Sequence, residues 1–220
     1  MFFITLISTK HSALGKCNSE ELYQILKAIK PSVIFDEIPS SHYDAYYGTK
    51  SRKSLESEAI NEYLKDHNAE IIPVDIDTSQ SLRQFQMQIH SLFSKIFQNQ
   101  DYIKLEKDME NLIIQHGFNY LNGIDFLDYL VKKEALIQQI IASDKDRDRL
   151  RKTHHVFQYI NHDSRENAML QNIYNHSKAA QYSHAVFLLG AEHRKSLLEK
   201  IPTFEASSNF KLKWRNYSDL

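Results

Sequence analysis

Short apolar runs alternate with helical periodicities over the first 75 residues of the chain. Three of these runs are expected to be strands that are buried on both faces: residues 2–7, 32–36 and 70–75. Between these runs, apolar residues spaced three and four apart predict helices over residues 19–30 and, after Lys53, through about residue 66. Because strand, helix and strand alternate, we predict an α/β fold whose first two strands form a parallel pair with a right-handed crossover.

The boundaries of these elements have local signals. Ser19 is the expected N-cap of the first helix, and Pro31 stops that helix. Residues 39–53 are polar, tyrosine-rich and aperiodic, so we expect a loop above the strand ends.

The pattern changes from about residue 79 to residue 159, where long helical periodicities replace the strand signals. A helix capped by Asp163 or Ser164, a buried strand over 184–189, a helix over 192–200 and a half-exposed edge strand over 210–214 follow. We interpret residues 1–220 as a single domain with a helical insertion, or cap, over about 80–160. Its core is a central, mostly parallel sheet flanked by helices.

Composition narrows the classes of partner and compartment. The 27 basic and 28 acidic residues nearly balance, so neither nucleic acid nor an anionic membrane is favoured as the main partner. A single cysteine, Cys17, rules out an intrachain disulfide, and neither a membrane-spanning run nor a signal peptide is recognisable. We therefore predict a cytoplasmic protein. The chain has no Gly-rich phosphate loop, and we expect no nucleotide cofactor.

Candidate chemistry follows the strand ends. His11 comes just after the first apolar run, Asp36 and Glu37 after the second, and His193 after the run that precedes Gly190. Since ligands and catalytic groups gather beyond the carboxyl ends of strands in α/β sheets, these side chains are expected in one cleft. The competing interpretation is a set of loop histidines and a structural ion pair.

Two further positions support a site. Gly190 allows a tight turn and close approach of the backbone to a ligand, although an ordinary strand-to-helix turn has the same composition. Arg165 lies in the first turn of a predicted helix, where a cation is disfavoured, so we expect it to have a partner such as Glu37 or a substrate anion. His154, His155 and His162 match no zinc spacing and are expected to be surface or packing residues.

Four segments, taken in order, resemble the TraB/TIKI superfamily: Ser8–His11, Phe35–Glu37, Arg165 with Met169, and Gly190–His193. Members carry a GxxH motif at each end, a glutamate after the second strand and an arginine that opens the penultimate helix; the superfamily is loosely related to erythromycin esterases and ChaN-like proteins. The middle of the chain is also similar, at Glu56, Ala59, residues 72–77 and Arg83. The chain departs from the pattern at Ser8, which replaces the first glycine, and at Glu166, where Asn or Asp is usual.

The resemblance implies a hydrolase that cleaves a peptide, amide or ester bond of a small molecule or peptide. We expect His11, Glu37 and His193 to hold zinc, manganese or cobalt, or to activate water directly. Arg165 would orient Glu37 or stabilise the developing oxyanion. Glu192 or Glu166 is the candidate general acid/base.

Three alternatives remain open. In the first, no metal is needed, and His11 acts as a general base oriented by Glu37. In the second, the cleft belongs to a non-catalytic module that binds a ligand or protein, with Tyr43, Tyr46 and Tyr47 as a recognition surface. In the third, the strand-end residues merely satisfy one another in a buried network.

Overall fold

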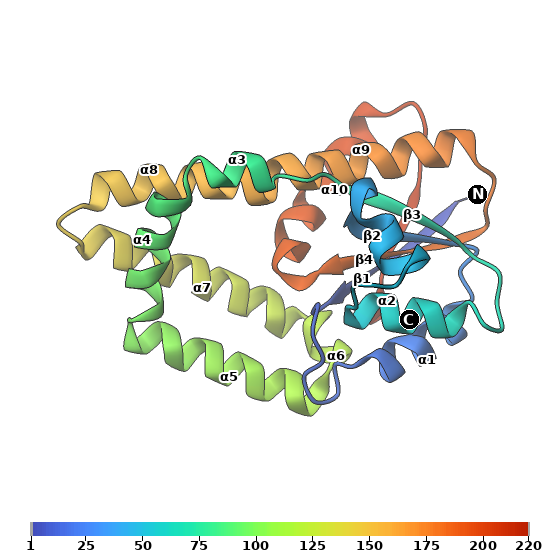
Figure 1. Cartoon of the computed structure of the whole chain (residues 1–220), viewed down its shortest axis with the longest axis horizontal. Helices are drawn as coiled ribbons and strands as arrows, with labels where there is room; N and C mark the ends of the chain where they lie inside the picture. Colours follow the sequence, from blue (N-terminus) through green and yellow to red (C-terminus); the bar gives the residue numbers. More distant parts are fainter. Residues whose placement is uncertain (1, 220) are drawn as a thin grey trace.

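The computed structural model describes residues 2–219, and within them the chain is an α/β fold on one five-stranded sheet. All strand pairs are parallel and the strand order is β3-β2-β4-β1-β5 (Figure 1). The strands are β1 (Phe3–Thr9), β2 (Val33–Pro39), β3 (Glu70–Asp75), β4 (His184–Gly190) and β5 (Lys213–Asn216). The predicted fold class is confirmed. β5 begins later than the predicted edge strand and is parallel to its neighbour β1.

Strand β4 lies between β1 and β2, so the predicted direct pairing of the first two strands is wrong. Residues 185–190 of β4 are all buried, which suits a strand that is covered on both faces and hydrogen-bonded at both edges. Thr9 pairs with Gly190, and Asp36 pairs with Leu188, so β1, β4 and β2 end at the same edge of the sheet.

Strand β2 is longer than predicted and includes Asp36 and Glu37. Both carboxylates are buried, and the strand continues past them through a register shift between Asp36 and Pro39. Pairing with β3 resumes at Pro39, opposite Asp75, so the charged end of β2 stays in the sheet.

Helices cover both faces of the sheet. Helices α1 (Ser19–Ile29) and α2 (Leu55–Tyr63) pack on one face, through a core that includes Leu26, Ile34 and Ile60. Helices α9 (Ser164–Ala179) and α10 (Arg194–Ser207) pack on the other, through a core that includes Phe35, Phe187 and Leu197. The cap of α1 is Asn18, one residue before the predicted Ser19, because the Asn18 side chain accepts the backbone N–H of Glu21 at 2.9 Å.

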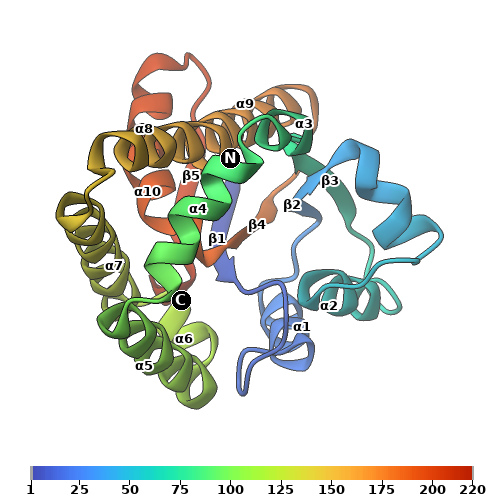
Figure 2. The same cartoon turned by 60° about the vertical axis from the view of Figure 1, so that its left-hand side comes forward.

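The segment between β3 and α9 is helical and extends away from the sheet (Figures 1 and 2). It contains α3 (Ser79–Arg83), α4 (Gln86–Phe97), α5 (Gln100–His116), α6 (Phe118–Leu121), α7 (Ile124–Ser143) and α8 (Arg147–Gln158). Its outer part has its own apolar cluster, which includes Leu92, Ile137 and Leu150. None of the helices among residues 2–219 is both long and apolar enough to cross a membrane.

Two segments are more helical than predicted. Residues 40–48 form a short 3-10 turn followed by a π-helical turn. A second π-helical turn, Tyr159–Asp163, joins α8 to α9, and the two helices run on in one line (Figure 1). Neither Asp163 nor Ser164 therefore caps a free helix end, since the chain is already helical when it reaches them.

Candidate functional site

Glu37 and His193 meet where β2 and β4 end. Glu37 Oε1 lies 3.3 Å from His193 Nε2, and the backbone N–H of Gly190 donates to Glu37 Oε2 at 2.5 Å. A Cβ atom on Gly190 would lie 3.1 Å from Glu37 Oε2 and 3.4 Å from Nε2 of His11. His11 and Glu37 thus approach the same side of Gly190, and the three strand-end side chains lie around one point.

Gly190 is needed for this close approach rather than for an unusual backbone conformation. Its φ of −55° is open to any residue. A methyl group there would press on the Glu37 carboxylate and on the His11 ring.

Arg165 binds two carboxylates from two strands. Its guanidinium donates to Glu37 Oε1 at 2.6 Å and to Asp75 Oδ2 at 2.7 Å. Glu37 is the partner that the sequence suggested, whereas Asp75, the last residue of β3, was missed although it has the same strand-end position. Because α8 and α9 are continuous, Arg165 is not at a free helix N-terminus, where a cation would be disfavoured. The carboxylates of Glu37 and Asp75 are sufficient to explain its position.

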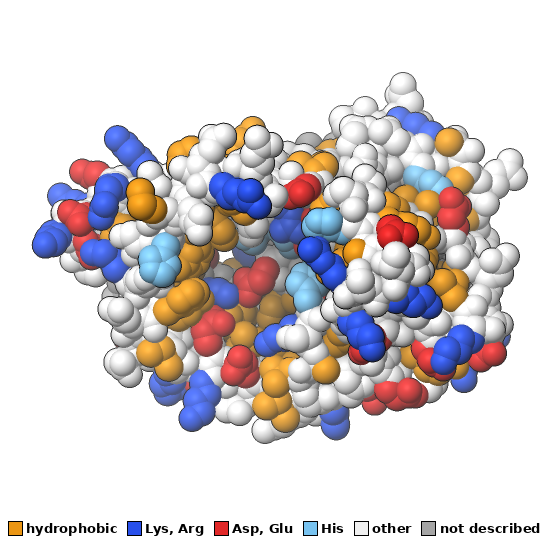
Figure 3. All heavy atoms as spheres, in the orientation of Figure 1, with side chains coloured by type: hydrophobic (Ala, Val, Ile, Leu, Met, Phe, Trp, Pro, Cys, Tyr) orange, Lys and Arg blue, Asp and Glu red, His pale blue; other side chains and the backbone are white. Residues whose placement is uncertain are grey.

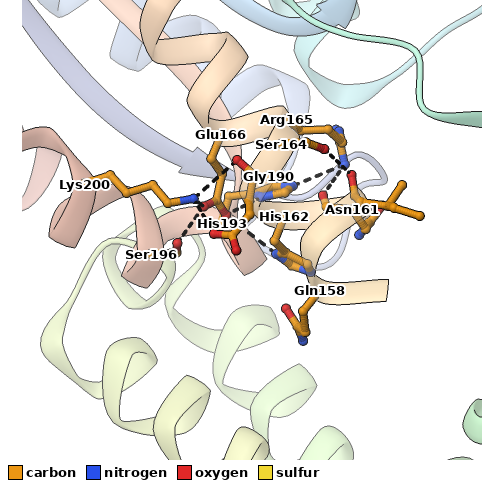
Figure 4. Close-up of polar contacts among 12 residues, drawn as sticks. Gln158, Asn161, His162, Ser164, Arg165, Glu166, Gly190, His193, Ser196 and Lys200 are labelled. Carbon is orange, nitrogen blue, oxygen red and sulfur yellow. Dashed lines mark hydrogen bonds and ion pairs between the residues drawn. The ribbon is translucent and has the colours of Figure 1, made fainter. Parts of the chain in front are cut away.

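Glu166 lies behind His193 and holds its ring (Figure 4). His193 Nδ1 is 2.8 Å from Glu166 Oε1, while Ser196 and Lys200 donate to Oε2 at 2.5 and 2.6 Å. Burial alone would raise the pKa of Glu166, but the hydrogen bonds from its histidine, lysine and serine neighbours hold that pKa well below its usual range. A carboxylate that stays ionised and fully buried suits an orienting role better than proton transfer.

Two carboxylates contact the His193 ring, those of Glu37 and Glu166. Each of them is also bound by a cation, Glu37 by Arg165 and Glu166 by Lys200. Burial lowers the pKa of His193, but the hydrogen bonds to Glu166 and Glu37 outweigh burial and raise the pKa to about 9. Burial would raise the pKa of Glu37, but the hydrogen bond from His193 and the positive charges of His193 and Arg165 outweigh this effect. They lower the pKa of Glu37 to about 2. The two carboxylates therefore favour the protonated form of the His193 ring.

His11 pairs with a different carboxylate from the one predicted. Its Nδ1 lies 3.3 Å from Oε1 of Glu56, which also accepts the Thr9 hydroxyl at 2.5 Å. Glu56 is buried on α2 and its Oε2 has no hydrogen-bond partner, whereas 64% of the His11 side chain is exposed. The hydrogen bond to Glu56 raises the pKa of His11 to about 9. The sequence feature that could have identified Glu56 as buried is its spacing on α2, where it shares the buried face with Ala59, Ile60 and Tyr63.

A group of potential metal ligands occurs beside the predicted one. Among residues 2–219, three ligand atoms of His162, Glu166 and His193 lie within 4.8 Å of one another. His162 was expected to be a surface or packing residue, yet it lines the site, and its ring centroid lies 4.7 Å from that of His193. Two imidazoles and a carboxylate suit zinc, manganese or cobalt.

The predicted ligand set is arranged differently. Arg165 lies 2.6 Å from Glu37 Oε1 and 3.3 Å from His193 Nε2, so its guanidinium already faces two of the three predicted ligands. His162, Glu166 and His193 form a second candidate set, in which Lys200 lies 2.6 Å from Glu166 Oε2 much as Arg165 lies beside Glu37.

These residues open onto a cleft of about 910 Å³ between the sheet and the helical segment. The space-filling view shows the hollow, with histidine, acidic, basic and apolar side chains around it (Figure 3). His11, Glu37, Arg165 and His193 line the cleft, as does Glu192, which forms an ion pair with Lys133 at 2.8 Å.

The tyrosines at residues 43–47 lie outside the lining of this cleft. The rings of Tyr43 and Tyr46 each pack near that of Tyr47, and the Tyr47 hydroxyl donates to Asp36 at 2.5 Å. Asp36 is buried, and burial raises its pKa to about 7. The Tyr47 hydroxyl is thus engaged by a buried carboxyl group and is not free to bind a ligand or protein.

Ser8, where the TraB/TIKI pattern has glycine, is fully buried behind the site. Its hydroxyl accepts a hydrogen bond from Arg194 at 3.3 Å, and its backbone N–H donates to Asn122 Oδ1 at 2.8 Å. The serine therefore has a structural role at the base of the cleft.

No family model, no curated protein and no solved structure matches the chain.

Proposed function

We propose that the protein is a hydrolase that cleaves an ester, amide or peptide bond with water activated by His11. The observation that carries this proposal is the placement of His11, whose Nδ1 faces buried Glu56 while its exposed ring lines the cleft. A carboxylate that fixes one ring nitrogen leaves the other to take a proton from water.

The groups across Gly190 supply positive charge. His193, whose carboxylate partners favour its protonated form, lines the cleft beside Arg165, so developing negative charge on a substrate carbonyl would be stabilised there. Arg165 is a positioning residue in this scheme, because its guanidinium is engaged by Glu37 and Asp75. Glu166 fixes the orientation of the His193 ring.

The TraB/TIKI resemblance favours a metal-activated water, and the second candidate is accordingly a metallohydrolase. The observation in its favour is the clustering of His162, Glu166 and His193. A divalent cation bound there would lower the pKa of a bound water toward neutrality.

The test is ester and peptide hydrolysis by the wild type, His11→Ala and His116→Ala, the last altering an exposed histidine outside the cleft lining. We expect His11→Ala to lower kcat/KM by roughly 10²–10⁴-fold while it stays folded by circular dichroism, with a lower unfolding midpoint because buried Glu56 loses its charged partner, and His116→Ala to have little effect. Because His11 loses its proton only as pH rises through about 9, wild-type kcat/KM should increase up to that pH.

The same assay separates the alternatives. Inactivation by a chelator, with a rate that levels off near pH 7, would replace His11 activation by the metal mechanism. Absence of hydrolysis, with or without zinc, manganese and cobalt, would contradict both and favour a binding module.

A further inference from the structure

The polar strand-end residues line only a small part of the cleft. The strand-end residues occupy one side, and helices α4, α5, α7 and α8 form the rest of the wall. The apolar side chains on this wall include Phe93, Met109, Phe126, Leu130, Ile137 and Phe157. The volume of about 910 Å³ lies near the upper end of the ~300–1,000 Å³ typical of small-molecule sites, so a substrate larger than its scissile group is expected.

This apolar wall is long. Phe126 and Ile137 both line the cleft from α7, with 2% and 6% of their area exposed, and are eleven positions apart, which corresponds to about 16 Å along a helix axis. Phe97 on α4 and Val131 on α7 extend the surface, with 56% and 50% of their area exposed. Large apolar side chains that remain exposed inside a cleft indicate that an apolar ligand covers them.

The basic side chain that lines the cleft from α7 offers little to an anionic ligand chain. Lys133, which lines the cleft from α7, lies 2.8 Å from Glu192 and 3.3 Å from Glu106. Its charge is therefore already balanced, and it offers little attraction to a substrate anion.

The backbone of the wall argues against an extended peptide. A peptide that binds in extended form needs main-chain hydrogen-bond partners, usually at the edge of a sheet. Here the wall is formed by helices, whose N–H and C=O groups bond within the helix. A hydrocarbon chain has no such requirement.

We propose that the substrate carries a long, uncharged acyl or alkyl chain that lies along α7, with its scissile bond beside His11. The position of the scissile bond rests on the proposed function, whereas binding of the chain does not. The reaction class is then hydrolysis of an acyl ester or amide, with water adding to the carbonyl and the alcohol or amine leaving with a proton.

The experiment measures binding of 2-alkanones, from 2-butanone to 2-decanone, by calorimetry or by displacement of a fluorescent fatty-acyl probe. These ketones resemble acyl esters but cannot be hydrolysed, so binding is read without turnover. Wild type, His11→Ala, Val131→Asp and Phe97→Asp are compared. Ile124→Asp, on α7, and Met87→Asp, on α4, are matched controls at exposed apolar positions outside the cleft lining.

We expect affinity in wild type and His11→Ala to increase with chain length, by up to about fourfold per methylene. Val131→Asp and Phe97→Asp should weaken 2-decanone binding at least tenfold, and the control variants less than twofold. Affinity that does not depend on chain length, or equal losses in the cleft and control variants, would overturn the proposal. If affinity increases with alkyl chain length but the protein hydrolyses no ester, the proposed function is refuted and this inference is supported.

Discussion

His11 and Glu56 form the unit on which the proposed chemistry depends. The exposed imidazole faces the cleft, and the buried carboxylate contributes a single oxygen to both His11 and Thr9. The hydrogen bond to Glu56 is the largest influence on His11 and moves its pKa from 6.5 to about 9. Activity and pH dependence should therefore change together when this carboxylate is removed.

Substitution of Glu56→Gln tests that coupling. Loss of the negative charge should return the pKa of His11 from about 9 toward 6.5, as followed by NMR titration of its ring protons. The inflection of kcat/KM should shift to lower pH by a similar amount, because neutral His11 then appears at lower pH. The limiting kcat/KM of the form with neutral His11, obtained by fitting the pH profile, should fall roughly tenfold or more, since the ring is less well oriented and less basic.

Glu58→Gln is the matched control, because Glu58 is exposed on the same helix. It should leave both the titration and the pH profile unchanged. A Glu56→Gln variant whose His11 still titrates near pH 9 would show that another group sets the pKa of this histidine.

At the scale of elements, the joint between α8 and α9 places much of the site. The π-helical turn Tyr159–Asp163 carries His162 and leads directly to Arg165 and Glu166. A π-helical turn inserts extra residues into a helix and shifts the faces that follow it, and such turns often occur at functional sites. The sequence indicated a new helix at this point because Asp163 and Ser164 are both good capping residues.

The start of α1 offers a stability prediction at the same scale. Asn18 accepts the Glu21 N–H and also donates to Gly15 O at 2.9 Å, whereas Ser19 is simply the first helical residue. Asn18→Ala should lower the free energy of unfolding by about 1 kcal/mol, measured by urea denaturation. Ser19→Ala, at the cap position that the sequence suggested, should change it by less than about 0.5 kcal/mol. The reverse order of effects would restore Ser19 as the cap.

At the scale of the whole molecule, a buried network ties the helical segment to the sheet. Asn122, between α6 and α7, accepts the backbone N–H of Ser8 at 2.8 Å and donates to the Ser8 carbonyl at 3.1 Å. Arg194 on α10 donates to the carbonyl of Asn122 at 2.6 Å and to the Ser8 hydroxyl at 3.3 Å. Strand β1, which leads to His11, is thereby joined to one wall of the cleft.

Asn122→Ala should consequently destabilise the fold by about 2 kcal/mol, because the buried Ser8 N–H loses its acceptor. Thermal or urea unfolding measures this loss, and 2-decanone binding reports whether the cleft wall has moved relative to the sheet. Asn119→Ala, at an exposed position on α6, should be within about 0.5 kcal/mol of the wild type. Equal stability of the two variants would mean that the network does not hold the two parts together.

The sequence by itself determined the elements and the edge at which the site lies. Alternation of buried strands with amphipathic helices predicted the α/β sheet, because burial on one face or on two leaves a periodic signature in the chain. The same pattern placed His11, Glu37 and His193 at strand ends, which lie at one edge of a parallel sheet. The Ser8 and Gly190 motifs and the position of Arg165 were also visible without coordinates.

Only the tertiary structure decided which of these residues are partners. His11 pairs with Glu56 rather than Glu37, Arg165 with Asp75 as well as Glu37, and His193 with Glu166. Strand order and the apolar wall of the cleft were likewise decided at this level. The physical reason is that periodicity reports how much of an element is buried but not what buries it. Contacts between residues as far apart as Arg165 and Asp75 depend on how whole elements pack.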